Sequence, residues 1–84
     1  MRDLTAMPNI GKEMASKLNF VGISSGEELI AVGSKQAFYR LKTQFPQVCL
    51  VHLYALEAAI QNVEFNNLSE NIKKDLKVFS DSLK

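Results

Sequence analysis

Residues 49–64, with the sequence CLVHLYALEAAIQNVE, decide how this chain folds. Large aliphatic residues recur at helical spacing along one face, at Leu50, Leu53, Leu56, Ile60 and Val63. Alanines and other apolar residues occupy much of the remaining circumference. A helix that is apolar over most of its surface is covered on several sides. The stretch therefore predicts the central helix of the domain.

The same helix offers a candidate interface. Apolar helix surface that a monomer leaves uncovered is suited to a second copy or to another protein. The candidate interface residues are Leu50, Leu53, Tyr54 and Glu57. A homodimer or a complex with another protein therefore stays open.

Short polar and glycine signals divide the rest of the chain into four more helices and an initial turn. The expected segments are a turn at 3–7 and helices at 12–20, 25–32, 35–45 and 69–83. Ser25 with Glu28 has the pattern of a capping box, and Ser34 and Ser69 are placed to cap the helices that follow them. Gly22 is suited to the left-handed end of a helix. No stretch alternates long enough to predict a strand, so the predicted fold class is all-α, a compact five-helix bundle.

Composition limits the function classes. The chain has 84 residues, 46% of them hydrophobic, and a formal net charge of +1. This length fits one domain, and the near-neutral charge argues against a strong electrostatic nucleic-acid binder. No run approaches the roughly 18–20 apolar residues of a membrane-spanning helix, and the first residues do not resemble a signal peptide. The single cysteine, Cys49, allows no internal disulfide. We therefore expect a cytoplasmic protein without a membrane partner.

The segment MPNIGK at residues 7–12 carries the main hint of chemistry. We expect a short helical turn to run through a tight turn into the next helix. Backbone amides around Asn9 and Gly11 would then point outward at a helix N-terminus, where partial positive charge favours an anion. Gly11 has no side chain to obstruct a phosphate. The pattern resembles a helix-hairpin-helix motif, which holds DNA by its phosphates without reading bases.

A weaker copy of the pattern follows later in the chain. Gly11 precedes Ala15 by four residues, as Gly33 precedes Ala37, so two stacked hairpins are expected. The N-terminal half is accordingly expected to be helix-hairpin-helix-like, similar to a SAM domain. The candidate DNA-binding residues are Asn9, Ile10, Gly11, Lys12, Lys17 and Lys35. In the alternative interpretation, the glycines only shape helical turns and meet no ligand.

Cys49 and His52 share a helical face at i and i+3. A structural zinc site takes four ligands, and the chain has no further cysteine or histidine, so we expect no metal site. If Cys49 and His52 were a catalytic nucleophile and base, they would also need a third group to orient them. The sequence shows no such group. We expect a buried thiol beside a hydrogen-bonded histidine, no catalytic residue and no cofactor.

Glu57 is a carboxylate within an apolar helix, so it needs a partner. We expect a structural contact with Arg40, Lys42 or Tyr39. The spacing of the aromatic residues indicates core or helix-end positions, with no row of exposed rings for stacking on bases. These residues are Phe38, Tyr39, Phe45, Phe65 and Phe79.

Several stretches, in a fixed order and spacing, resemble one known family. They include LTAMPNIG at 4–11, AFYRLK at 37–42 and LYALEAAI at 53–60, with shorter matches at 18–23, 28–33 and 68–69. Together they extend over residues 4–77 and are similar to the C-terminal domain of the TfoX/Sxy family, the regulators of natural DNA competence. Residues 1–84 are thus expected to form a single domain of this type, free of the N-terminal domain of longer members.

The resemblance implies an all-helical fold and a role in competence or transcriptional regulation, without catalysis or a cofactor. Our leading hypothesis is a non-enzymatic module that contacts double-stranded DNA weakly and without sequence specificity. The alternative is a protein–protein interaction module that uses the apolar central helix. A DNA binder gathers its lysines around the turn, whereas an adaptor exposes an apolar patch near residues 49–60.

Overall fold

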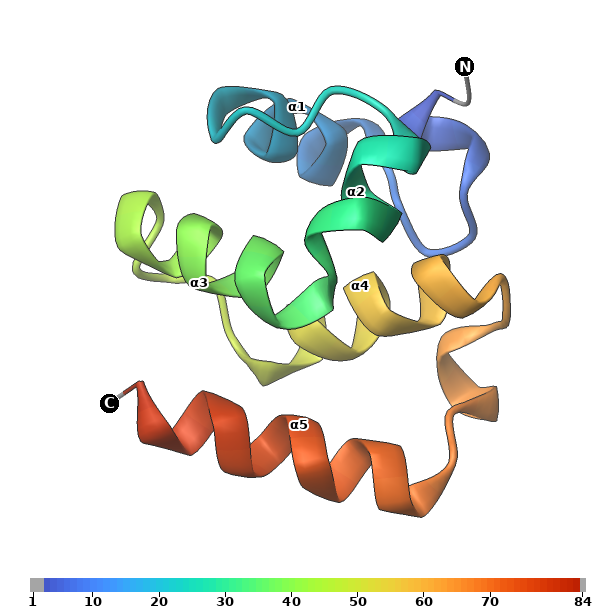
Figure 1. Cartoon of the computed structure of the whole chain (residues 1–84), viewed down its shortest axis with the longest axis vertical. Coiled ribbons are helices and arrows are strands. Elements are labelled where there is room, and N and C mark those ends of the chain that lie inside the picture. The colour runs from blue at the N-terminus through green and yellow to red at the C-terminus, as the bar shows by residue number, and fades with distance from the viewer. Residues whose placement is uncertain (1–2, 84) are drawn as a thin grey trace.

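Seven helical segments follow one another in residues 3–83, the part of the chain that the computed structural model describes (Figure 1). They are the 3₁₀ turn η1 (Leu4–Ala6), the helices α1 (Lys12–Phe20), α2 (Gly26–Val32), α3 (Ser34–Gln44) and α4 (Leu50–Gln61), the 3₁₀ turn η2 (Phe65–Asn67) and the helix α5 (Glu70–Ser82). These residues contain no strand. The predicted all-α fold of five helices is confirmed.

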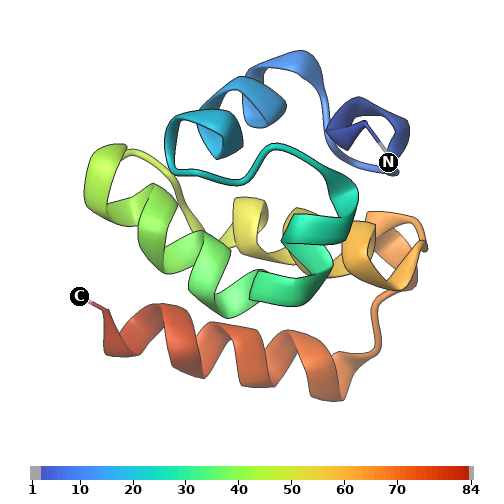
Figure 2. The same cartoon turned by 45° about the horizontal axis from the view of Figure 1, so that its top comes forward.

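The helices form layers, with α3 and α4 between α1 on one side and α5 on the other (Figures 1 and 2). Helix α4 packs against α2, α3 and α5. Four of its side chains are buried, at Leu53, Leu56, Ala58 and Ala59. The prediction that this stretch forms the central helix is therefore confirmed.

The expected start and stop signals operate at most helix ends. Gly22 follows α1 with a φ of 88°, and the Ile23 amide donates to the Leu18 carbonyl at 2.9 Å. Both of those side chains are fully buried, so the turn closes over the core. The Ser25 hydroxyl accepts from the Glu28 amide at 3.2 Å, which confirms one half of the predicted capping box. The Glu28 carboxylate makes a different contact, accepting from the neighbouring Ser24 hydroxyl.

Two predicted helix ends are wrong. Gly33, with a φ of 91° and a ψ of 156°, is the N-cap of α3, and Ser34 is the first residue of that helix. The Ser34 hydroxyl is buried and donates to Glu57 of α4, so it does not cap α3. Helix α4 ends at Gln61, because Asn62 takes a left-handed conformation with a φ of 59°. The last three residues of the expected helix, 62–64, therefore lie in the connection to η2.

The core lies between the layers and is dominated by Phe38 and several fully buried leucines. Ser69 caps α5 as predicted, its hydroxyl accepting from the Ile72 amide at 3.2 Å. None of the helices that the structure describes has the length and apolar character needed to cross a bilayer.

Candidate nucleic-acid interface

The tight turn before α1 is held in place by the Asn9 side chain. Asn9 has a φ of 69°, in the left-handed region that asparagine tolerates. Its Nδ2 donates to the Val63 carbonyl at 3.0 Å, and its Oδ1 accepts from the Phe65 amide at 3.3 Å. Val63 lies in the connection between α4 and η2, and Phe65 is the first residue of η2. The side chain of Asn9 therefore fixes the turn.

Helix α1 begins at Gly11, and nothing in the fold requires a glycine there. Its φ of −91° suits any residue, and a Cβ built at this position has no heavy atom within 4 Å. The Ala15 amide donates to the Gly11 carbonyl at 2.9 Å, which is the first hydrogen bond of the helix. Since glycine supplies no side-chain cap, the amides of the first turn stay open at the surface. The adjacent Ile10 is buried in the core, as expected.

A shallow groove of about 310 Å³ runs beside this helix start, and we call it the hairpin groove. Its walls come from the turn, α1 and α4. The lining residues are Asn9, Gly11, Glu13, Met14, Lys17, Val51, His52 and Ala55. The structure therefore brings the predicted phosphate-binding turn together with one edge of the predicted interface helix.

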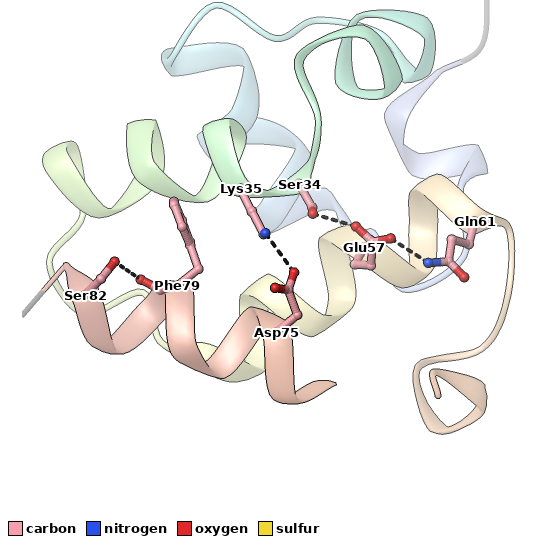
Figure 3. A network of polar contacts seen from close by, with 7 residues as sticks. All are labelled: Ser34, Lys35, Glu57, Gln61, Asp75, Phe79 and Ser82. Atoms are coloured by element: carbon pink, nitrogen blue, oxygen red, sulfur yellow. Dashed lines mark hydrogen bonds and ion pairs between the residues drawn. The ribbon is translucent and has the colours of Figure 1, made fainter. Parts of the chain in front are cut away.

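The three candidate lysines have different surroundings. Lys12 is exposed in the first turn of α1, and Lys17 lines the hairpin groove. The Lys17 ammonium lies 5.7 Å from the centre of the Phe45 ring, within reach of a cation–π interaction. Lys35 lies on the side of α3 that faces α5, where its Nζ is 2.7 Å from an Asp75 carboxylate oxygen (Figure 3). The structure thus places Lys12 and Lys17 on α1 and directs Lys35 toward α5.

The candidate interface residues of α4 are mostly engaged within the fold. Leu53 is fully buried, and Leu50 packs against the core. The Tyr54 hydroxyl donates to the Lys73 carbonyl at 3.4 Å. The most exposed apolar residue of this helix is Val51, at 57%. The free edge of α4 is therefore the one that lines the hairpin groove.

Glu57 has the structural role expected for it, but the expected partners were wrong. The Ser34 hydroxyl donates to Glu57 Oε1 at 2.6 Å, and the Gln61 amide donates to Oε2 (Figure 3). Arg40 instead donates to the Val21 carbonyl, and Lys42 donates to the carbonyls of the loop before α4. The carboxylate therefore joins α4 to α3 through neutral donors.

The thiol of Cys49 is exposed, which corrects the expectation of a buried cysteine. Cys49 is the N-cap of α4, and its amide donates to His52 Nδ1 at 3.1 Å. The hydrogen-bonded histidine is thereby confirmed. In residues 3–83 no three side chains of the metal-ligating types gather closely enough to hold a metal ion.

Asp3 precedes η1 and caps it. The amide and the hydroxyl of Thr5 both donate to Asp3 Oδ1 at 2.9 Å. Both bonds favour the charged carboxylate, so they hold the pKa of Asp3 below its ordinary value of 3.8. The bond from the Thr5 amide has the larger effect, and the bond from the Thr5 hydroxyl has the smaller one.

Two aromatic side chains are exposed, which corrects the expectation that no row of exposed rings is available for stacking. Phe20 is 69% exposed at the end of α1, and Tyr39 is 52% exposed on α3. The sequence did carry a signal for Phe20. It lies two residues after the buried Leu18, and two residues turn a helix by about 200°, toward the solvent side. Both rings line one groove between the end of α1 and α3.

The fold and this surface together define a class: a small all-α domain of five helices whose first helix starts at an open glycine. Residues 1–80 match the family model of the TfoX C-terminal domain. The chain belongs to this family, as the sequence resemblance indicated.

Two solved structures from Listeria monocytogenes are similar to this chain. One, an uncharacterized protein in a triclinic crystal form, is 43% identical with a TM-score of 0.95, and the match covers 96% of this chain and 92% of that one. The other, a protein of unknown function in a tetragonal form, is 43% identical with a TM-score of 0.94, covering 98% of this chain and 100% of that one. No curated protein matches the chain.

Proposed function

We propose that this protein is a small non-enzymatic regulatory module that contacts double-stranded DNA through its phosphates, without reading sequence. The observation that carries this proposal is the start of α1. There Gly11 leaves the first-turn amides without a side-chain cap, in open space that the fold itself does not use. Helix N-termini of this kind bind anions through their amides and the helix dipole.

The charges around the turn support a weak contact. Lys12 and Lys17 lie on α1, while Glu13 in its first turn opposes an anion. Two lysines that neutralise two phosphates give a slope of about −2 for log affinity against log salt concentration. We assign no phosphate contact to Lys35, because Asp75 neutralises it. Binding is thus expected at low salt and is expected to weaken strongly at physiological salt.

The family supplies the biological setting of the proposal. Resemblance to the TfoX/Sxy regulators suggests a role in competence or transcriptional regulation, in the cytoplasm and without a cofactor. A module that holds phosphates weakly suits a regulator whose specificity comes from a larger complex.

The test is a titration of a labelled duplex, followed by fluorescence anisotropy at low and at physiological salt. Gly11→Val places a branched side chain over the helix start, in a backbone conformation that valine adopts without strain. Lys12→Glu/Lys17→Glu reverses the local charge. The matched control is Lys74→Glu/Lys77→Glu, which changes the same number of charges at exposed positions of α5.

The proposal expects both α1 variants to lose duplex binding and the α5 control to retain most of it. Circular dichroism and thermal melting establish that each variant is folded. Equal losses in the two double variants would mean that only net charge matters. Normal binding by folded Gly11→Val would show that the turn does not contact phosphate.

A second candidate function is docking of another protein, or a second copy, on the free edge of α4. The observation that favours it is the exposure of Val51 beside Ala55 in the hairpin groove. Sedimentation velocity over a range of concentrations tests the second copy. If α4 forms a dimer, Val51→Asp shifts the equilibrium to monomer, and a monomer at all concentrations in the unaltered protein excludes this form of docking.

A further inference from the structure

A second groove, of about 420 Å³, lies between the end of α1 and the exposed face of α3, and we call it the aromatic groove. Its lining residues are Phe20, Val21, Tyr39, Arg40, Thr43 and Gln44. The two rings are the exposed Phe20 and Tyr39 described above. Single exposed apolar residues are common on proteins, but two rings that share one groove with a guanidinium form a surface of defined chemistry.

The charge of this groove is positive. Arg40 is its charged lining residue, and no carboxylate lines it within the described chain. Arg40 Nη1 donates to the Val21 carbonyl at 3.5 Å, which holds the guanidinium at the end of α1. That bond uses one of the five N–H donors of an arginine. All charged residues of α3, which are Lys35, Arg40 and Lys42, are cationic.

A stack of side chains connects the aromatic groove with the hairpin groove. The ring of Phe20 packs edge-on against Phe45, with 5.5 Å between centroids. The Lys17 ammonium lies 5.7 Å from the centre of that second ring and also lines the hairpin groove. One cation and two rings therefore follow one another beside the last turn of α1, between the two grooves.

We propose that the aromatic groove binds single-stranded nucleic acid, with unpaired bases stacked on Phe20 and Tyr39 and phosphates held by Arg40 and Lys17. Surfaces that bind single strands combine cations along the backbone with rings on which bases stack, and they tolerate any sequence because every base has a π-face. Bases inside a duplex are already stacked on each other, so these rings select unpaired nucleotides. The inference deepens the proposed function by naming DNA with an unpaired segment as the partner.

The first experiment is a titration of a labelled oligothymidylate of about 12 nucleotides, at low salt, by fluorescence anisotropy. Each of Phe20→Ala and Tyr39→Ala removes one stacking ring, which lowers the affinity by about 5- to 150-fold. Controls of matched exposure are Val78→Ala on α5, at 69%, and Ile30→Ala on α2, at 48%. Both controls are expected to bind as the unaltered protein does.

Tyrosine emission gives a readout that a purely structural role would not change. The chain has two tyrosines and no tryptophan, so Tyr54→Phe leaves Tyr39 as the single strong emitter. Stacking of a base on Tyr39 quenches this emission as the oligonucleotide is added. Tyr39→Phe keeps the ring and is expected to restore the binding that Tyr39→Ala loses.

Lys12→Glu separates this inference from the proposed function. It alters the start of α1, outside the aromatic groove, and is expected to reduce duplex binding much more than oligothymidylate binding. If the unaltered protein binds oligothymidylate but no duplex, the proposed duplex contact is refuted and the aromatic groove stays supported. Folded, unaltered protein that binds no oligothymidylate would overturn the inference and favour a protein partner for this groove. Equal losses in ring variants and matched controls would overturn it as well.

Discussion

The turns before α1 and before α3 begin alike and end in different surroundings. Gly11 and Gly33 are both N-caps without a side chain, and each carbonyl accepts the first hydrogen bond of its helix, from Ala15 at 2.9 Å and from Ala37 at 3.0 Å. The similar sequences thus place a glycine N-cap at both helix starts, although φ is −91° at Gly11 and 91° at Gly33. The similarity is limited to these helix starts.

What surrounds each turn decides what it can do. Before α3, the Ser34 hydroxyl is bound to Glu57, and Lys35 is paired with Asp75 and lies over the Phe79 ring (Figure 3). Before α1, Lys12 is exposed, and open space lies over Gly11. A shared sequence pattern therefore gives one turn engaged by contacts within the fold and one that is free to meet an anion.

The largest expected difference between the turns is in the cost of adding a side chain. Gly33 has a φ of 91° and a ψ of 156°, a region that essentially only glycine occupies, so Gly33→Ala is expected to cost about 1–3 kcal/mol of unfolding free energy. Gly11 has an ordinary φ, so Gly11→Ala is expected to cost less than about 1 kcal/mol. Urea denaturation of both variants measures the difference, and equal losses would contradict it.

The hydrogen bond between Ser34 and Glu57 is expected to have the next largest effect on the free energy of unfolding. Ser34→Ala removes a 2.6 Å hydrogen bond to a half-buried carboxylate, and we expect a loss of about 1–1.5 kcal/mol. The matched control is Ser24→Ala, which removes an exposed serine–glutamate bond and should cost no more than about 0.5 kcal/mol. Thermal melting compares the two variants. A larger loss in Ser24→Ala would mean that the turn before α3 does not depend on this bond.

Lys12 and Lys35, which follow the two turns, are expected to differ in their effect on duplex binding. Lys12→Gln is expected to weaken duplex binding several-fold and to reduce the salt slope by about 1, because one phosphate contact is lost. Lys35→Gln is expected to leave duplex binding unchanged and to cost less than about 1 kcal/mol of stability, as an exposed ion pair does. Anisotropy at several salt concentrations tests both. Equal effects on the salt slope would place Lys35 on the DNA after all.

The smallest expected effect is a pH dependence at Asp3, which caps η1 ahead of the open turn. The pKa of Asp3 is lower in the folded protein, so its contribution to stability is present above the ordinary value of 3.8 and is lost as the pH falls through the folded value. Asp3→Asn removes this titration. The variant's melting temperature is therefore expected to fall less than that of the unaltered protein below about pH 4. Parallel curves would show that Asp3 does not couple to folding.

The helices could be predicted from the sequence because their ends are marked locally. Gly22, Ser25 and Ser69 act within a few residues of themselves, and the structure confirms each. The apolar spacing of residues 49–64 likewise identified the central helix. Signals of this kind depend only on residues close by in the sequence, so they can be recognised in a single sequence.

The errors share a different cause, contacts between residues far apart in the chain. Ser34 does not cap its own helix because Glu57, 23 residues later, takes its hydroxyl. Arg40 was an expected partner of that carboxylate, but its guanidinium donates to the Val21 carbonyl at the end of α1. Phe20 was overlooked because its importance comes from Tyr39 and Arg40 in the same groove. The packing of the helices decides these contacts, and the local pattern of residues does not.

The hydrogen bonds of Asn9 have a consequence for the order of assembly. Its partners Val63 and Phe65 lie 54 and 56 residues away, so the bonds close most of the chain into a loop. Contacts between such distant residues bear a larger entropic cost than local ones, so we expect them to form late in folding. During synthesis, a chain that has not yet emerged past Phe65 lacks these bonds. The turn before α1 therefore gains these two bonds only after residues 63–65 have been made.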